Sequence, residues 1–279
     1  MYRHESGGGG FFLEFKGAMG GIYRITEWIT RFAYSNILWM LCSSPFFFFL
    51  VTKMLVTGAN ESLQMNWAMG IVAPFTLFPA TAALFAVVRK WVMGDTDVKI
   101  FSMFFRSYKE NYKQSMIGGV FYVLLLVIML VDYTVYMTQF NNLQIIGIVM
   151  LILLIVLFIS LFNFFSMIVH YHMGILQILK NAVLITIIRP LRVITTVLGS
   201  AVVLFVGSKY PALIFFFGGS LIAFWAFFNF YATFTKMQEQ AERIKQKELE
   251  EQEAAALEGD SQDEPDDADS WEKEAVKKD

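Results

Sequence analysis

Six apolar runs, each close to the length needed to cross a bilayer, constrain this chain more than any other feature. A hydrocarbon core of about 30 Å requires about 20 apolar residues of α-helix. Charged residues make up only 16% of the chain and phenylalanine occurs 29 times, which is far from the composition of a soluble domain. The sequence therefore predicts an all-α, polytopic membrane helical bundle of about six transmembrane helices, at residues 32–51, 67–88, 116–136, 143–169, 191–207 and 212–231.

The positions of Lys and Arg predict the orientation of these spans. Segments on the cytoplasmic side of a membrane retain an excess of positive charge. Four Lys or Arg residues precede the first span, six lie between the second and third, three lie between the fourth and fifth, and four follow the sixth. The three remaining connections carry one, none and one. This alternation of cation-rich and cation-poor segments requires the fifth apolar run to be a span, although Pro190 directly precedes it. We therefore predict a multi-pass membrane protein with both termini in the cytoplasm.

Composition divides the chain into four predicted regions. Residues 1–31 form a cytoplasmic arm with a short interfacial helix, and residues 32–235 form the six-span membrane domain. Residues 236–258 are rich in Glu, Gln, Lys and Ala and predict a polar cytoplasmic helix. Residues 259–279 contain too little apolar surface to offset the entropy of folding and predict a disordered acidic tail.

The segment between the second and third spans predicts a basic amphipathic helix. Asp95, Thr96 or Asp97 is a candidate N-cap for it. Aromatic residues recur at helical spacing on one face and form a candidate membrane-facing stripe, made of Phe101, Phe104, Phe105, Tyr108 and Tyr112. Cations occupy the opposite face and form a candidate partner-docking face, made of Lys99, Arg106, Lys109 and Lys113.

This helix has two interpretations. It lies at the interface with its aromatic residues toward the lipid or the bundle, or its cationic face binds a cytoplasmic partner. Nucleic acid is not an expected partner, because a position beside the inner leaflet already explains the positive charge.

Four segments carry a resemblance to a known family. They are "SNILWMLCSSP", "FPATAALFAVVRKWVMGDTD", "FFRSYKENYKQSMIGG" and "ILKNAVLITIIRPLR". In this order they resemble the YesL-like family, domain of unknown function 624, over residues 11–231. The resemblance implies a bacterial integral membrane protein of the Gram-positive type, often encoded beside carbohydrate-uptake and polysaccharide-utilisation genes. It implies no catalytic residue.

The candidate functional residues inside the spans are few. Pro74 and Pro79 remove two backbone donors from the second span, either to open a cavity or to kink a packing helix. Asp132 is the only acid within a span, and it is a proton or cation site or marks the outer interface. His170 and His172 point apart on a helix, so we expect an inner-interface position and no metal site.

The expected function is a non-enzymatic one without a cofactor. No paired carboxylates, nucleophile with a base, or nucleotide-binding glycine loop occurs in recognisable form. We expect an accessory component of solute uptake. The bilayer is one candidate partner, and through the family resemblance alone the subunits of an ABC-type carbohydrate importer are others. The alternatives are a small transporter in its own right, with Pro74, Pro79 and Asp132 near its pathway, and a membrane scaffold.

Overall fold

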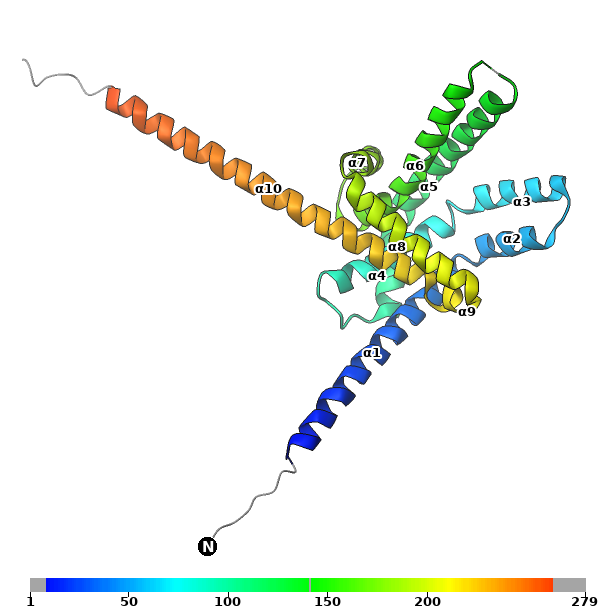
Figure 1. The fold of residues 1–279 in the computed structure, drawn as a ribbon, viewed down its shortest axis with the longest axis horizontal. Coiled ribbons are helices and arrows are strands. Elements are labelled where there is room, and N and C mark those ends of the chain that lie inside the picture. Colours follow the sequence, from blue (N-terminus) through cyan, green and yellow to red (C-terminus); the bar gives the residue numbers. More distant parts are fainter. Residues whose placement is uncertain (1–8, 141, 263–279) are drawn as a thin grey trace, which may run out of the picture. The chain divides into compact units, whose positions relative to one another are not determined.

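The computed structural model describes residues 9–140 and 142–262, and all regular secondary structure in these residues is helical (Figure 1). The elements in chain order are α1 (Gly9–Cys42), α2 (Ser44–Leu55), α3 (Ala59–Val72), α4 (Leu77–Val92), α5 (Ile100–Thr138), α6 (Gln144–His170), α7 (Ile175–Ile188), α8 (Pro190–Lys209), α9 (Pro211–Leu213), the π-helix η1 (Ile214–Gly218) and α10 (Gly219–Gln262). The predicted all-α fold class is confirmed.

The described residues contain four helices that are long and apolar enough to cross a membrane, namely α5, α6, α8 and the segment from α9 into α10. Two further spans exist if a bent helix pair is counted as one. In the first pair, α1 and α2 meet at an angle of 80°, and in the second, α3 and α4 meet at 53°. The predicted spans at residues 32–51 and 67–88 are therefore not straight helices.

Proline explains both bends. Pro45 stands in the first turn of α2, where its missing N–H costs nothing, and the chain turns at Ser43 just before it. Pro74 lies in the four-residue break between α3 and α4, and Pro79 lies in the first turn of α4. Pro79 cannot donate to the Phe75 carbonyl four residues earlier, and Tyr112 of α5 donates its hydroxyl to that carbonyl at 3.4 Å.

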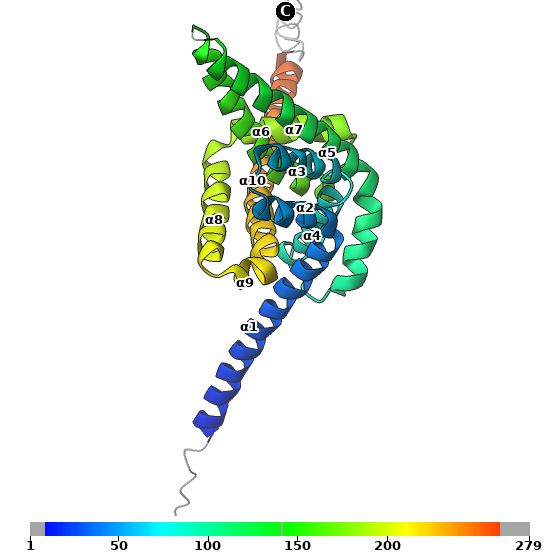
Figure 2. The same ribbon diagram turned by 90° about the vertical axis from the view of Figure 1, so that its right-hand side faces the viewer.

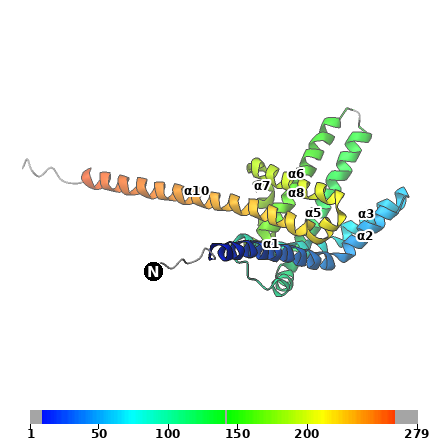
Figure 3. The same cartoon turned by 60° about the horizontal axis from the view of Figure 1, so that its bottom comes forward.

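Two antiparallel helix pairs pack side by side, α2 with α3 and the later part of α5 with α6 (Figures 1 and 3). A third pair forms where α8 returns through α9 and η1 into the start of α10 (Figure 2). The indole nitrogen of Trp225 donates to the Thr195 carbonyl at 2.8 Å across this pair.

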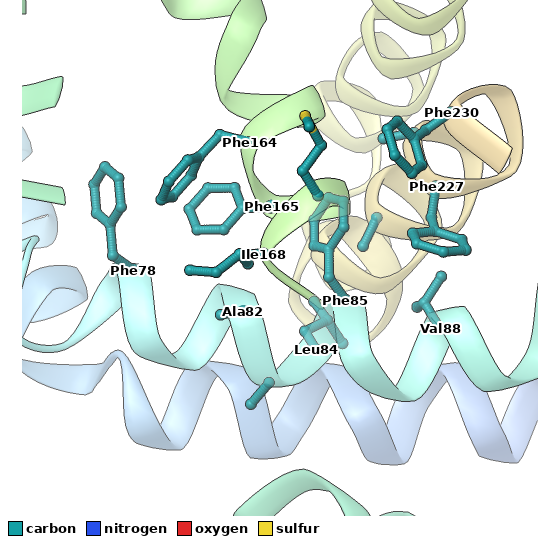
Figure 4. Packing of buried hydrophobic residues seen from close by; sticks show 14 of the residues in the cluster. Phe78, Ala82, Leu84, Phe85, Val88, Phe164, Phe165, Ile168, Phe227 and Phe230 are labelled. Atoms are coloured by element: carbon teal, nitrogen blue, oxygen red, sulfur yellow. The ribbon is translucent and has the colours of Figure 1, made fainter. Parts of the chain in front are cut away.

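The chain divides into two compact units, residues 1–231 and 232–279. The core of the first unit surrounds α4, eleven of whose sixteen residues are buried. Alanines let neighbouring helices approach α4, and phenylalanines from α6 and α10 fill the space around it (Figure 4). Phe165 contacts both Phe78 and Phe85, with ring centroids 5.3 and 5.6 Å apart.

The described part of the second unit is the remainder of α10, which is helical to Gln262. Its side chains from Lys236 to Gln252 are exposed, as their polar composition requires. Most of the predicted acidic tail, residues 263–279, and the first eight residues of the predicted arm lie outside the described residues.

Single cysteines test the predicted orientation. In a Cys42→Ser background, cysteines at Lys53, Gln139 and Lys209 are expected to react with an impermeant thiol reagent in intact cells. Cysteines at Lys109 and Lys180 are expected to react only after the cells are opened. Both of these side chains are exposed, so lack of labelling would reflect the membrane and not burial in the protein. Labelling at position 180 in intact cells would contradict the six-span arrangement.

Candidate functional site

The structure places the candidate docking face on one exposed side of α5. Lys99 precedes the first residue of α5, and Arg106, Lys109 and Lys113 follow at helical spacing, all with exposed side chains. Arg106 donates through Nε to Glu110 at 2.8 Å, which neutralises part of this face. Among the side chains that the structure describes, the three lysines form no ion pair.

The opposite side of α5 packs into the protein. Phe104 is fully buried, and Phe105, Tyr108 and Tyr112 are half-buried, whereas Phe101 is 56% exposed. The stripe of aromatic residues therefore lies mostly against the bundle, and the cationic side of α5 is the one that remains accessible.

The start of α5 differs from the prediction. None of the three candidate N-cap residues caps the helix, which begins at Ile100 after Lys99 without a side-chain hydrogen bond. The N-cap prediction is wrong because two of these side chains are used elsewhere. Asp97 accepts from Arg31 of α1 at 3.2 Å, and Asp95 accepts from Lys90 at 3.2 Å. The predicted interfacial helix and third span also form one continuous helix.

Gly94 sets the turn that leads into α5. Its φ of +94° lies in the left-handed region that favours glycine. The Gly94 amide donates to the Trp91 carbonyl, and the Asp95 amide donates to the Lys90 carbonyl, which together form a Schellman motif at the end of α4. The turn before the cationic face is therefore held by backbone hydrogen bonds and by the positive φ of Gly94.

The break between α3 and α4 lies beside two cavities. One, of about 430 Å³, is lined by Pro74 and by residues of α3 and α5. The other, of about 310 Å³, lies between α1, α4, α6 and the first residues of α10. Its polar side-chain atoms are Trp39 Nε1 and Thr81 Oγ1, which bond to each other at 3.0 Å. Pro79 is buried in α4. Asp132 is half-buried on α5, thirteen residues beyond Gly119, the α5 residue that lies against Pro74 and Phe78, so the structure does not bring Asp132 to the two prolines.

His170 ends α6 in an aromatic environment formed by Tyr171, Phe227, Phe230 and Tyr231, with ring centroids 5.1–6.2 Å away. Burial raises the pKa of the neighbouring Tyr171 hydroxyl. Within the described residues, no group of three His, Cys, Asp or Glu side chains could hold a metal ion.

Sequence reasoning missed a set of buried and half-buried polar residues that join the helices. Asn36 donates to the Phe215 carbonyl at 2.6 Å and accepts from the Ser220 amide at 2.9 Å. Tyr122 bonds Ser160 at 2.9 Å, and Asn163 donates to Thr186 at 2.8 Å. A polar residue within an apolar run was the available signal, because such a residue is costly unless it finds a partner.

These features define a helical membrane protein whose polar residues join its spans and whose α5 carries an exposed cationic face. A family model described as "Protein of unknown function, DUF624" matches residues 32–133. Together with the relatives described next, it shows that the chain belongs to the YesL-like family, DUF624, which confirms the predicted resemblance.

Three similar proteins come from Bacillus subtilis (strain 168), and each is described as uncharacterized. YesV is 31% identical over 196 residues, which cover 66% of this chain and 94% of YesV. YteU is 29% identical over 81% of this chain and 91% of its own length, and YesL is 28% identical over 81% and 95%. No solved structure matches the chain.

Proposed function

We propose that this protein is a non-enzymatic accessory component of solute uptake, and that it docks on a cytoplasmic or membrane subunit of a transporter through the cationic face of α5. The observation that carries the proposal is the division of α5 into two sides. The side centred on Phe104 is buried in the bundle, whereas Lys99, Lys109 and Lys113 are exposed and have no acidic partner among the described side chains.

The chemistry of this face favours a partner with an acidic surface. Complementary charge speeds encounter and fixes the orientation of two docking surfaces more than it adds affinity. A helix that is anchored by its buried side also presents its cations in a fixed array. This reduces the entropy lost when the partner binds.

Carbohydrate is the favoured solute through the family resemblance, and subunits of an ABC-type importer are the candidate partners. The 310 Å³ cavity supports an accessory role more than transport of a sugar by this chain. A sugar site needs several convergent polar groups, whereas the side-chain polar atoms here, Trp39 Nε1 and Thr81 Oγ1, are already bonded to each other.

Charge reversal at Arg106, Lys109 and Lys113 tests the docking face. The triple change to Glu is expected to lower recovery of transporter subunits by at least about tenfold when the full-length protein is purified from its host in mild detergent. Membrane abundance should not change, because all three side chains are exposed. Both quantities are measured in the same preparation.

The matched control reverses Lys236, Arg243 and Lys247, which are also exposed and give the same change in net charge. Its recovery of transporter subunits should equal that of the unmodified protein. Equal recovery with the α5 variant would refute docking through this face. If the unmodified protein recovers no transporter subunit at all, the accessory role itself fails and the alternative of an independent transporter gains support.

A further inference from the structure

A groove between α3 and α5 has the form of a site for an amphiphile. Its volume is about 430 Å³, and the side chains along it are almost all apolar. They include Gly70, Ile71 and Pro74 on one side and Val120, Leu124 and Ile128 on the other. The groove is open along one side and lies on the membrane-spanning part of the chain.

Close contacts define the direction of the groove. A Cβ atom at Gly119 would lie 3.0 Å from the Pro74 Cα atom, and one at Gly70 would lie 3.7 Å from Val123. Positions therefore increase along α5 as they decrease along α3. Pro74 with Val120 lines one end of the groove, and Asn66 with Ile128 lines the other.

Only the Asn66 end of the groove is polar. Lys53 of α2 donates through Nζ to Asn66 Oδ1 at 2.5 Å, which leaves the amide NH₂ of Asn66 and the other ammonium protons as donors. Lys53 forms no ion pair with any side chain that the structure describes. This end therefore offers a positive charge and several donors without a matching acceptor.

Trp67 indicates the depth of this end in the membrane. It lines the groove beside Asn66 and is 53% exposed. Tryptophan is enriched where the hydrocarbon core meets the head groups, and the predicted orientation puts Lys53 on the outer side. The polar end thus lies at the level of lipid phosphates, and the apolar length extends toward the middle of the bilayer.

We propose that this groove is a binding site for one phospholipid of the outer leaflet. One acyl chain lies between α3 and α5 along Gly70 and Pro74, and the phosphate accepts from Lys53 Nζ and Asn66 Nδ2. The apolar side chains of the groove suit a hydrocarbon chain. Lys53, at the polar end, favours an anionic group. The proposal is independent of the accessory role.

Two substitutions separate the chain contact from the phosphate contact, with native mass spectrometry of the full-length protein in mild detergent as the measurement. Gly70→Leu is expected to remove the bound phospholipid. The Cβ atom of the new leucine would lie 3.7 Å from Val123, which is an ordinary contact. The rest of the leucine side chain would fill the groove and leave no space for an acyl chain. Lys53→Gln is expected to lower occupancy about fivefold, which corresponds to about 1 kcal/mol for one lysine at a head group.

Lys209→Gln is the matched control, because Lys209 is the exposed cation of the other predicted outer connection and does not line the groove. Its phospholipid occupancy should equal that of the unmodified protein. Thermal unfolding of each variant is measured alongside, and Gly70→Leu should unfold within a few degrees of the unmodified protein. A Gly70→Leu protein that unfolds early is replaced by Gly70→Val, which fills less of the groove, and its occupancy is then judged by the same criterion.

Four results would overturn the site. Equal phospholipid occupancy in a folded groove-filling variant would place the lipid elsewhere. Equal retention of diacylglycerol and phospholipid, or equal occupancy after Lys53→Gln, would show that the phosphate contact does not contribute to binding. Stabilisation of the delipidated protein by inorganic phosphate alone, without any effect of added phospholipid, would show that the site binds free phosphate.

Discussion

Replacement of Asn36 by leucine is expected to lower the free energy of unfolding by about 2–4 kcal/mol and the unfolding midpoint by roughly 5–15 °C. The Asn36 side chain is fully buried, and it bonds both the Phe215 carbonyl and the Ser220 amide. Leucine keeps the bulk but makes neither bond. A polar group left unpaired in an apolar interior costs about 1–3 kcal/mol, and this substitution leaves two.

The π-helix η1 makes this contact specific. A π-helical turn leaves carbonyl groups without their usual intrahelical partners, and Asn36 supplies a donor to one of them. Gly219 allows the approach, since a Cβ atom there would lie 2.9 Å from Asn36 Oδ1. Asn36 thus holds α1 against the turn that leads into α10.

Thr30→Val is the control for Asn36→Leu. Thr30 lies on the same helix, but its hydroxyl is exposed and donates to the Thr26 carbonyl of its own helix. Its loss should change the free energy of unfolding by no more than about 0.5 kcal/mol. Thermal unfolding in detergent measures both variants. Equal midpoints for them would show that the Asn36 contacts do not stabilise the fold.

The apolar runs could be predicted because their signal is local. Length and hydropathy alone identify residues 116–136, 143–169 and 191–207, and each lies inside one helix of the structure or begins one residue before it. The bend at Ser43 had a local signal as well, because Pro45 has no N–H to donate to the Leu41 carbonyl in a continuous helix, but the apolar composition of residues 32–51 favoured one straight span.

The parts that could not be predicted depend on contacts between distant residues. Helical spacing identifies the two faces of α5, but it does not determine that Phe104 packs in the bundle while Phe101 remains exposed. Asn36 lies 179 residues before Phe215, so no local pattern reveals its partner. The ion pair between Arg31 and Asp97 likewise joins distant segments, and it explains why a good N-cap sequence does not cap α5.

Gly119→Leu is expected to destabilise the protein by about 3 kcal/mol, at the upper end of the usual cost of overpacking. A Cβ atom at Gly119 would lie 2.7 Å from the Phe78 ring and 3.0 Å from the Pro74 Cα atom. The ring can move, but the Pro74 backbone is fixed by the break between α3 and α4. Leucine at this position therefore forces α5 away from the break.

Gly21→Leu is the matched control, and its effect should have the opposite sign. Gly21 lies in α1, and a Cβ atom added there would have no neighbour within 4 Å, so leucine gains helix propensity worth up to about 1 kcal/mol. Thermal unfolding and phospholipid occupancy are measured on both variants. Because Gly119 sets the contact at the Pro74 end of the groove, Gly119→Leu should lose stability and phospholipid together, whereas Gly70→Leu should lose phospholipid alone. A stable Gly119→Leu protein would show that the close approach of α5 to Pro74 is not required by the fold.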